Sequence, residues 1–200
     1  MKNQPQERIL QIIRKQGMIR PRDLTRHNLP RSFLYRMHAE GLIERHARGV
    51  YVAAGNPISS HHSLLIAAKR IPNGVICLLS ALQFHEIGTQ SQPHVWMAIA
   101  EKARRPKLDY PSMRIVRFSE TALHAGAEKH KVKGVQLSIY SVAKTVADCF
   151  KYRNKIGTDV AIEALKDALS SRKCTRDQIW NYATICRVSK IILPYMESLS

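Results

Sequence analysis

Four residues in the segment 30–40 have side chains suited to contacting nucleic acid. The apolar spacing predicts a helix here, with Phe33, Leu34 and Met37 on its inward face. An arginine can donate two hydrogen bonds to one guanine, and a serine hydroxyl can bond to a base edge or to a phosphate. The outward positions, where we expect contacts with bases or flanking phosphates, hold Arg31, Ser32, Tyr35 and Arg36.

Further candidate contact residues, most of them cations, lie before and after this segment. Those before it are expected to contact backbone phosphates, which fixes the position of a protein on DNA without reading its sequence. These candidate phosphate contacts are Arg20, Arg22, Thr25 and Arg26. Those after it lie in a short basic turn, which suits a minor groove or a phosphate ridge. The candidate residues of this turn are Arg45, His46 and Arg48.

The elements that must hold these side chains follow the order of a winged helix-turn-helix. Helices are predicted over 8–16, 21–27 and 30–40, and Gly41 is expected to end the third in a left-handed conformation. Two short strands, 42–45 and 50–52, would form the wing. We therefore expect a DNA-binding domain over residues 1–55. The alternative is a winged helix used only for protein contact, but arginines on every outward face favour DNA.

The charge of the whole chain indicates a polyanionic partner. Its 200 residues include 32 Lys or Arg and 15 Asp or Glu, for a net charge of +17 and an isoelectric point near 10.1. Residues 1–55 hold eleven of the cations and four of the acids, so the remainder is basic as well. Such a field attracts nucleic acid. A basic protein with no such partner is the simpler alternative.

The rest of the chain predicts a mixed domain over 60–200, with a small sheet followed by a helical bundle. The fold class is therefore α+β. Ser80 is expected to cap one of the helices, and the last helix is expected to kink or break near Pro194. The predicted strands are 95–99, 113–118 and 135–140, residues 75–79 are predicted as a short buried strand or the start of a helix, and the predicted helices are 63–71, 80–86, 142–154, 158–171 and 175–198.

Several segments together resemble one protein family. The first are Gly41-Leu-Ile-Glu-Arg and Arg48-Gly49-Val50-Tyr51, which are similar to the wing of the AbiEi antitoxins of abortive-infection systems. The resemblance covers nearly the whole chain, and its later segments are the more specific. These are His61-His62-Ser63-Leu64-Leu65, Leu79-Ser80-Ala81-Leu82 and SVAKTVADCFKYRN, which runs from Ser141 to Asn154.

The resemblance implies more than the residue patterns do. It implies a two-domain regulator of a type IV toxin–antitoxin pair, active in phage defence. The N-terminal domain would bind inverted repeats in the promoter of its own operon and repress it, and the C-terminal domain would be needed for antitoxin activity. The partner would be a nucleotidyltransferase-like toxin, without a stable complex between the two proteins.

Residue patterns for catalysis or metal binding are weak. Adjacent helical residues such as His61 and His62 point in different directions, so a packing role is the better interpretation. Glu128-Lys129-His130-Lys131 is only faintly similar to a nuclease pattern, whose carboxylates must converge on a metal. Lys144 and Asp148 have the spacing of an ion pair on a helix face. The four cysteines, interpreted as reduced thiols, are Cys77, Cys149, Cys174 and Cys186.

These observations favour a cytoplasmic DNA-binding repressor and antitoxin that is not an enzyme, uses no cofactor or metal and does not contact a membrane. The sequence holds no apolar run long enough for a membrane span, and its first residues lack the apolar stretch of a secretion signal. Two alternatives remain: a nuclease-like enzyme with a winged-helix targeting domain, and an interaction protein that neutralises a toxin by contact.

Overall fold

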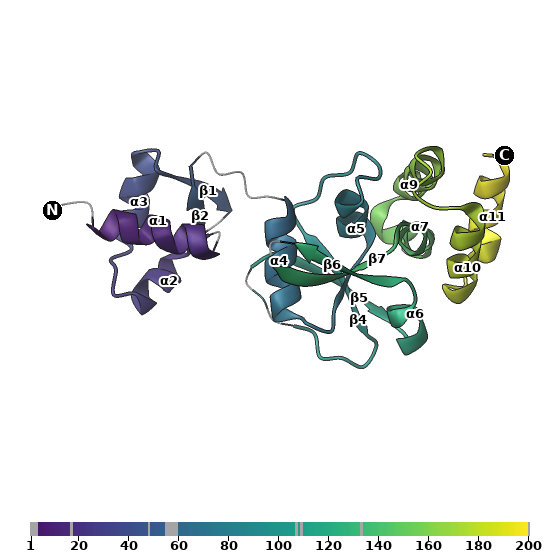
Figure 1. Cartoon of the computed structure of the whole chain (residues 1–200), viewed down its shortest axis with the longest axis horizontal. Helices are drawn as coiled ribbons and strands as arrows, with labels where there is room; N and C mark the ends of the chain where they lie inside the picture. Colours follow the sequence, from purple (N-terminus) through teal and green to yellow (C-terminus); the bar gives the residue numbers. More distant parts are fainter. Residues whose placement is uncertain are drawn as a thin grey trace. The chain divides into compact units, whose positions relative to one another are not determined.

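The computed structural model describes residues 4–16, 18–47, 49–54, 60–106, 108, 110–132 and 134–199. Within these ranges, nothing is described of the side chains of residues 4, 15, 16, 46, 47 and 60. The chain divides into two compact units, Met1–His62 (unit 1) and Ser63–Ser200 (unit 2), and each is considered by itself (Figure 1). In the described residues, no helix combines the length and the apolarity needed to cross a membrane.

Unit 1 contains three helices followed by a two-stranded antiparallel hairpin, the order of a winged helix. The hairpin pairs Ile43 with Ala53 and Arg45 with Tyr51. Ile19, between the first two helices, forms an isolated antiparallel β-bridge with Tyr51, because its N–H and carbonyl each bond to the backbone of Tyr51 at 2.9 Å. The elements are α1 Gln4–Gln16, α2 Pro21–Arg26, α3 Ser32–Ala39, β1 Ile43–Ala47 and β2 Val50–Ala53.

One apolar core holds the elements of unit 1 together, and burying each large aliphatic side chain contributes about 1.5–3 kcal/mol. Phe33, predicted to face inward, is only partly buried. Two residues with positive φ set the ends of the helices, Asn28 (φ 55°) after α2 and Gly41 (φ 69°) after α3. Gly41 thus ends the helix as predicted. The buried core residues are Ile9, Ile13, Ile19, Leu24, Leu34, Met37, Ile43 and Tyr51.

Unit 2 is built on a five-stranded mixed sheet with the order β5-β4-β3-β7-β6. Strands β4 and β5 are parallel, β3 is antiparallel to β4 and parallel to β7, and β6 and β7 form an antiparallel hairpin. The central strand β3 is the shortest. The strands are β3 Val75–Ile76, β4 Val95–Ala100, β5 Met113–Phe118, β6 Ala127–Val132 and β7 Val135–Tyr140.

Helices cover both faces of this sheet (Figure 1). Helix α4 packs against one face through Leu64, Leu65 and Ala67. On the other face α7 is the central helix, and it contacts α5, α9, α10 and α11. The predicted α+β fold class is therefore confirmed. The helices are α4 Ser60–Arg70, α5 Leu78–Phe84, α6 Glu120–His124, α7 Val142–Lys151, α8 Arg153–Ile156, α9 Thr158–Ser170, α10 Arg176–Ile185 and α11 Ser189–Glu197.

Two predicted details of unit 2 are wrong. Ser80 does not cap a helix, because α5 already begins at Leu78; its hydroxyl instead accepts a hydrogen bond from the Trp96 N–H at 2.9 Å and so joins α5 to β4. The last long helix does not break at Pro194, which lies inside α11. It breaks at residues 186–188, where Arg187 has a φ of 59° and the Val188 N–H bonds to the Ala183 carbonyl at 2.8 Å.

The predicted ion pair of Lys144 and Asp148 is present but fully buried. The Lys144 Nζ lies 2.6 Å from Oδ1 and 2.5 Å from Oδ2 of Asp148, and neither side chain has any exposed surface. The ammonium also lies 4.1 Å from the ring centroid of Tyr140, and the Cys186 thiol donates to Asp148 at 3.2 Å. Burial raises the pKa of Asp148, and the neighbouring ammonium opposes that rise. This cluster anchors the helical side of unit 2.

Candidate nucleic-acid interface

The outward face of α3 presents the residues that the sequence predicted there. Leu34 and Met37 point into the core with no exposed surface, which fixes the rotation of the helix. Tyr35 is 63% exposed, an unusually large fraction for an aromatic side chain. The four predicted contact residues of this helix and its N-cap are all exposed: Arg31, Ser32, Tyr35 and Arg36.

Arg36 is held in place while staying open to solvent. Its guanidinium carbon lies 4.6 Å from the ring centroid of Phe33, and its Nε lies 3.8 Å from Glu40 Oε1. Glu40 in turn accepts a hydrogen bond from Gln6 of α1 at 2.8 Å. The Arg36 and Glu40 side chains are 55% and 44% exposed, so water screens the pair and it is worth little. The guanidinium is therefore oriented but can exchange this carboxylate for another anion.

The residues predicted to contact phosphates fall into two groups. Arg22, Thr25 and Arg26 of α2 are exposed. Arg20, which precedes α2, is only partly exposed. Its Nε lies 3.9 Å from Asp23 Oδ2. The same carboxylate accepts a hydrogen bond from the Arg20 N–H at 3.0 Å. Asp23 therefore balances much of the charge of Arg20.

The wing is described in part. Arg45 lies exposed on β1, opposite Tyr51. The strand pairing shifts between Arg45 and Ala47, which is an irregularity of the β-bulge kind. His46 belongs to β1, but its side chain is not described, and Arg48 lies outside the described residues.

Two contacts of this surface were not predicted from the sequence. Glu40 orients Arg36, and its i, i+4 spacing from that arginine was the available signal. His38 joins α3 to the wing, since its Nδ1 lies 3.1 Å from the carbonyl oxygen of Ile43 and its ring packs edge-on against Tyr51. Helix α3 and the hairpin are thus connected by a polar contact as well as by the core.

The residues considered for catalysis belong to different elements. On β6, His130 Nε2 lies 3.3 Å from Glu128 Oε2, whereas His61 and His62 lie in the first turn of α4. Among the described residues, no three His, Cys, Asp or Glu side chains come together as a metal site would require. Burial raises the pKa of the Cys149 thiol, which leaves it mostly protonated.

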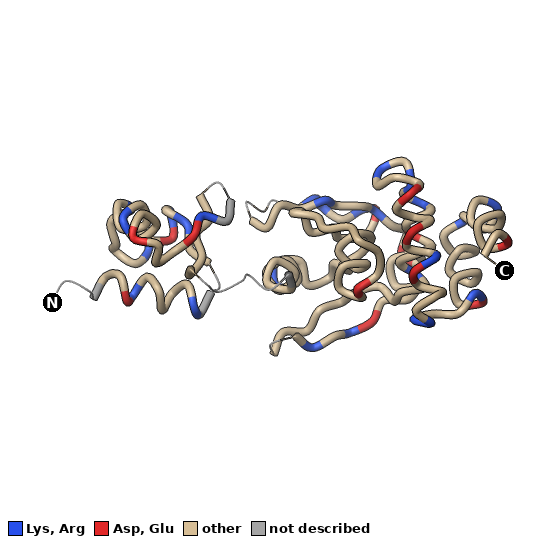
Figure 2. The backbone as a smooth tube through the Cα atoms, turned by 90° about the horizontal axis from the view of Figure 1, so that it is seen from above, with Lys and Arg blue, Asp and Glu red and all other residues tan. Residues whose placement is uncertain are grey.

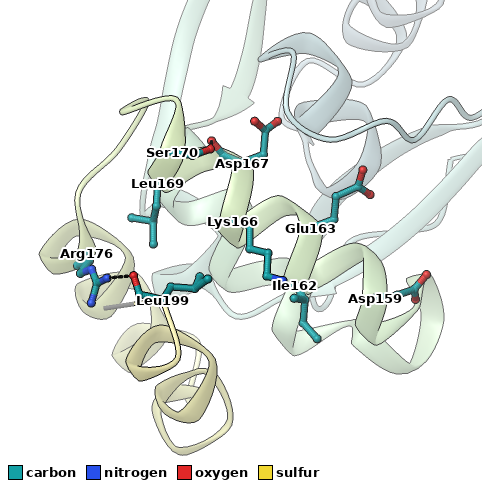
Figure 3. A pocket seen from close by; sticks show the side chains of 9 residues that line it. All are labelled: Asp159, Ile162, Glu163, Lys166, Asp167, Leu169, Ser170, Arg176 and Leu199. Carbon is teal, nitrogen blue, oxygen red and sulfur yellow. Dashed lines mark hydrogen bonds between the residues drawn. The ribbon is translucent and has the colours of Figure 1, made fainter.

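A wide hollow runs along α9 in unit 2 (Figure 3). Two of the carboxylates that line it are engaged, because Asp167 accepts a hydrogen bond from the Gly88 N–H at 2.7 Å and Glu163 accepts one from the Thr89 N–H at 3.0 Å. Arg176, on the far side, donates to the carbonyl oxygen of Leu199. These contacts fasten the segment after α5 and the end of α11 to the helical bundle.

The N-terminal elements match a known family. Residues 7–54, which run from α1 to the end of the hairpin, match the model described as "Transcriptional regulator, AbiEi antitoxin". The predicted resemblance is confirmed for this segment. The matched residues include every residue that the sequence predicts to contact DNA, from Arg20 to Arg48. The later segments that also resemble AbiEi proteins lie beyond the matched residues.

A solved structure is similar in fold. The crystal structure of the Rv2827c protein from Mycobacterium tuberculosis aligns with a TM-score of 0.55 at 12% sequence identity, over 96% of this chain and 78% of that chain. At this identity the likeness concerns the fold alone. A search of curated protein sequences finds no match.

Proposed function

We propose that the chain is a sequence-specific DNA-binding repressor that binds inverted repeats in the promoter of its own operon. The observation that carries the proposal is the exposed polar face of α3, from Arg31 to Arg36. In a helix-turn-helix, the second helix of the pair lies in the major groove with its N-terminal residues against the base edges. Helix α3 is the second of such a pair, and its exposed polar residues begin at its N-terminus. The AbiEi match supports the same role.

The remaining cations of unit 1 set the register of the protein on DNA. Arg22, Thr25 and Arg26 contact backbone phosphates beside the major groove, and Arg20 contributes less because Asp23 lies against it. Arg45, His46 and Arg48 of the wing reach the adjacent minor groove or phosphates. Repression is steric, since the occupied promoter excludes the polymerase.

The second part of the proposal is an antitoxin role in the cytoplasm, in a type IV system for phage defence. The partner is a nucleotidyltransferase-like toxin that forms no stable complex with the chain. The chain acts without catalysis of its own. The word "antitoxin" in the description of the matched family supports this part of the proposal.

A reporter gene behind the DNA upstream of this chain's own gene tests the proposal. Supplying the chain in trans is expected to lower reporter expression, and the double variant Arg31→Ala/Arg36→Ala is expected to abolish this effect. Glu197→Gln, an exposed residue at the end of α11, is the control and should repress as the wild type does. Unchanged expression with a folded, expressed chain would contradict autorepression.

The two alternatives have their own signatures. Metal-dependent cleavage of DNA by the purified chain would favour the nuclease-like enzyme. Co-purification of a stable complex with the product of the neighbouring gene would favour neutralisation by direct contact.

A further inference from the structure

A pocket at one end of the sheet in unit 2 has the features of a small-molecule site. It lies beside the residues that precede the short central strand β3, which begins only at Val75. Strand β3 pairs Val75 with Ala98 and Ile76 with Met97, and it goes no further. The Gly74 N–H instead bonds to the Ile71 carbonyl at 3.0 Å, so the residues just before β3 form a turn and do not extend the strand. The last residues of β4 therefore have no central strand beside them, and a hollow takes its place.

This sheet-end pocket has a volume of about 460 Å³, within the range of roughly 300–1,000 Å³ that small ligands occupy. Its floor is apolar and is formed by side chains that include Val75, Ile99 and Leu123. Each of these is 5% exposed or less, so the floor is fixed by the core beneath it. A ligand resting there would meet an apolar surface that is already in place.

The wall formed by residues 100–106 is held by one side chain. Arg117 of β5 donates from Nη1 to the carbonyl oxygens of Ala100, Glu101 and Ala103, the last at 2.7 Å. On the opposite side the turn before β3 is closely packed, since a Cβ at Gly74 would lie 2.5 Å from the sulfur of Met97. Both walls are thus set by contacts within the protein, which lowers the cost of ordering the site when a ligand binds.

The polar groups at the rim favour an anion. The lining includes Arg104, whose guanidinium carries a fixed positive charge. Glu120 is the acidic residue of the lining, and its Oε2 already lies 3.2 Å from Nε2 of His124. Both side chains of this pair are about three-quarters exposed, so water screens the Glu120 carboxylate, and the exposed guanidinium of Arg104 supplies a fixed positive charge for an anion.

We propose that the sheet-end pocket binds a small organic anion, with its apolar body on the floor and its carboxylate or phosphate at Arg104. This site is independent of the candidate DNA interface, because it is built only from unit 2. A planar ring system with one anionic group has the size and the polarity that the pocket accepts.

The test is a titration of the full-length ¹⁵N-labelled chain with 2-naphthoate, 2-naphthyl phosphate and the neutral 2-naphthylmethanol, followed by amide chemical shifts. We expect saturable shifts confined to residues 72–75, 100–106 and 120–127. The neutral probe should bind about tenfold more weakly or worse, because a charge-assisted hydrogen bond is lost. The better of the two anionic probes distinguishes a carboxylate from a phosphate ligand.

Three variants separate this site from general attraction to a basic protein. Arg104→Gln should remove the preference for the anionic probes, while Arg114→Gln, an exposed arginine of β5 outside the pocket, should leave it intact. Ala103→Phe fills the hollow and should abolish binding of all three probes, with an unchanged thermal unfolding midpoint as evidence of folding. Shifts scattered over the surface, equal effects of Arg104→Gln and Arg114→Gln, or no saturation would overturn the proposal.

Discussion

Two ion pairs with the same i, i+4 spacing lie in opposite environments in the two units. In unit 1, Arg36 and Glu40 are about half exposed and 3.8 Å apart. In unit 2, Lys144 and Asp148 have no exposed surface and are 2.5 Å apart. The exposed pair is screened by water and is worth about 0.3–0.5 kcal/mol, whereas removing one partner of a buried pair leaves an uncompensated charge in the core.

The difference indicates what each pair does. A weak pair lets Arg36 stay oriented by Phe33 and Glu40 and still leave the carboxylate for a base or a phosphate. A buried pair cannot exchange partners at all, so Lys144 and Asp148 serve the stability of unit 2. The same sequence pattern therefore supports binding in one unit and packing in the other.

The largest expected effect is on the buried thiol beside Asp148. Burial raises the pKa of Cys186 to about 12 from its ordinary value of 9.0. Its thiolate at pH 8 should therefore be roughly a thousandfold scarcer than in an unperturbed thiol. In alkylation by iodoacetamide followed by peptide mass spectrometry, Cys186 should react far more slowly in the native than in the denatured chain. Equal rates in the two states would mean that this side of unit 2 is open.

Asp148→Asn should lower the free energy of unfolding by about 3–5 kcal/mol, because it leaves the Lys144 ammonium buried without a counter-charge. Urea denaturation of the full chain measures this change. The matched control is Glu40→Gln, which breaks the exposed pair of the same spacing. A loss below 1 kcal/mol for Asp148→Asn would show that the pair is not buried in solution.

Arg36→Ala should weaken binding to the specific operator by about 1–3 kcal/mol and relax the preference for its sequence. Arg22→Ala should weaken binding to all DNA alike and lower the salt dependence by about one phosphate contact. Fluorescence anisotropy on specific and random duplexes separates the two effects. If both variants behave identically on both duplexes, the assigned rotation of α3 on DNA is wrong.

The smallest effect is expected from Glu40→Gln. Stability should change by about 0.5 kcal/mol or less, since only a screened pair is lost. DNA binding should be retained or become slightly tighter, because the carboxylate no longer competes with DNA for Arg36 and one negative charge is removed. The same anisotropy titration measures this. A marked loss of affinity would show that Glu40 is needed to position the arginine.

The sequence predicted the elements that carry strong local signals. Gly41 ends α3 as expected, and the alternating apolar residues of β5 and β7 gave strands with the observed bounds. Strand β6 was missed because it is an edge strand whose residues are mostly polar, so it lacks an apolar alternation. The ion pair of Lys144 was visible in the spacing, but its burial was not, since burial depends on how α5, α9 and α10 pack around α7.

The candidate interface was also predicted only in part from the sequence. The exposed face of α3 followed from which residues were apolar, and the structure places Leu34 and Met37 inward as expected. The pairing of Arg20 with Asp23, which makes it a weaker phosphate candidate, was not predicted. That pairing depends on the backbone conformation at the start of α2, where the carboxylate turns back to the Arg20 N–H.

The most direct measurement is a mobility-shift titration of the full chain on the DNA upstream of its own gene, against a scrambled duplex of equal length, at two salt concentrations. Phosphate contacts weaken on both duplexes as salt rises, whereas base contacts preserve the difference between them. We predict that a preference for the upstream duplex survives at the higher salt. Equal binding to both duplexes that collapses with salt would contradict a sequence-specific repressor.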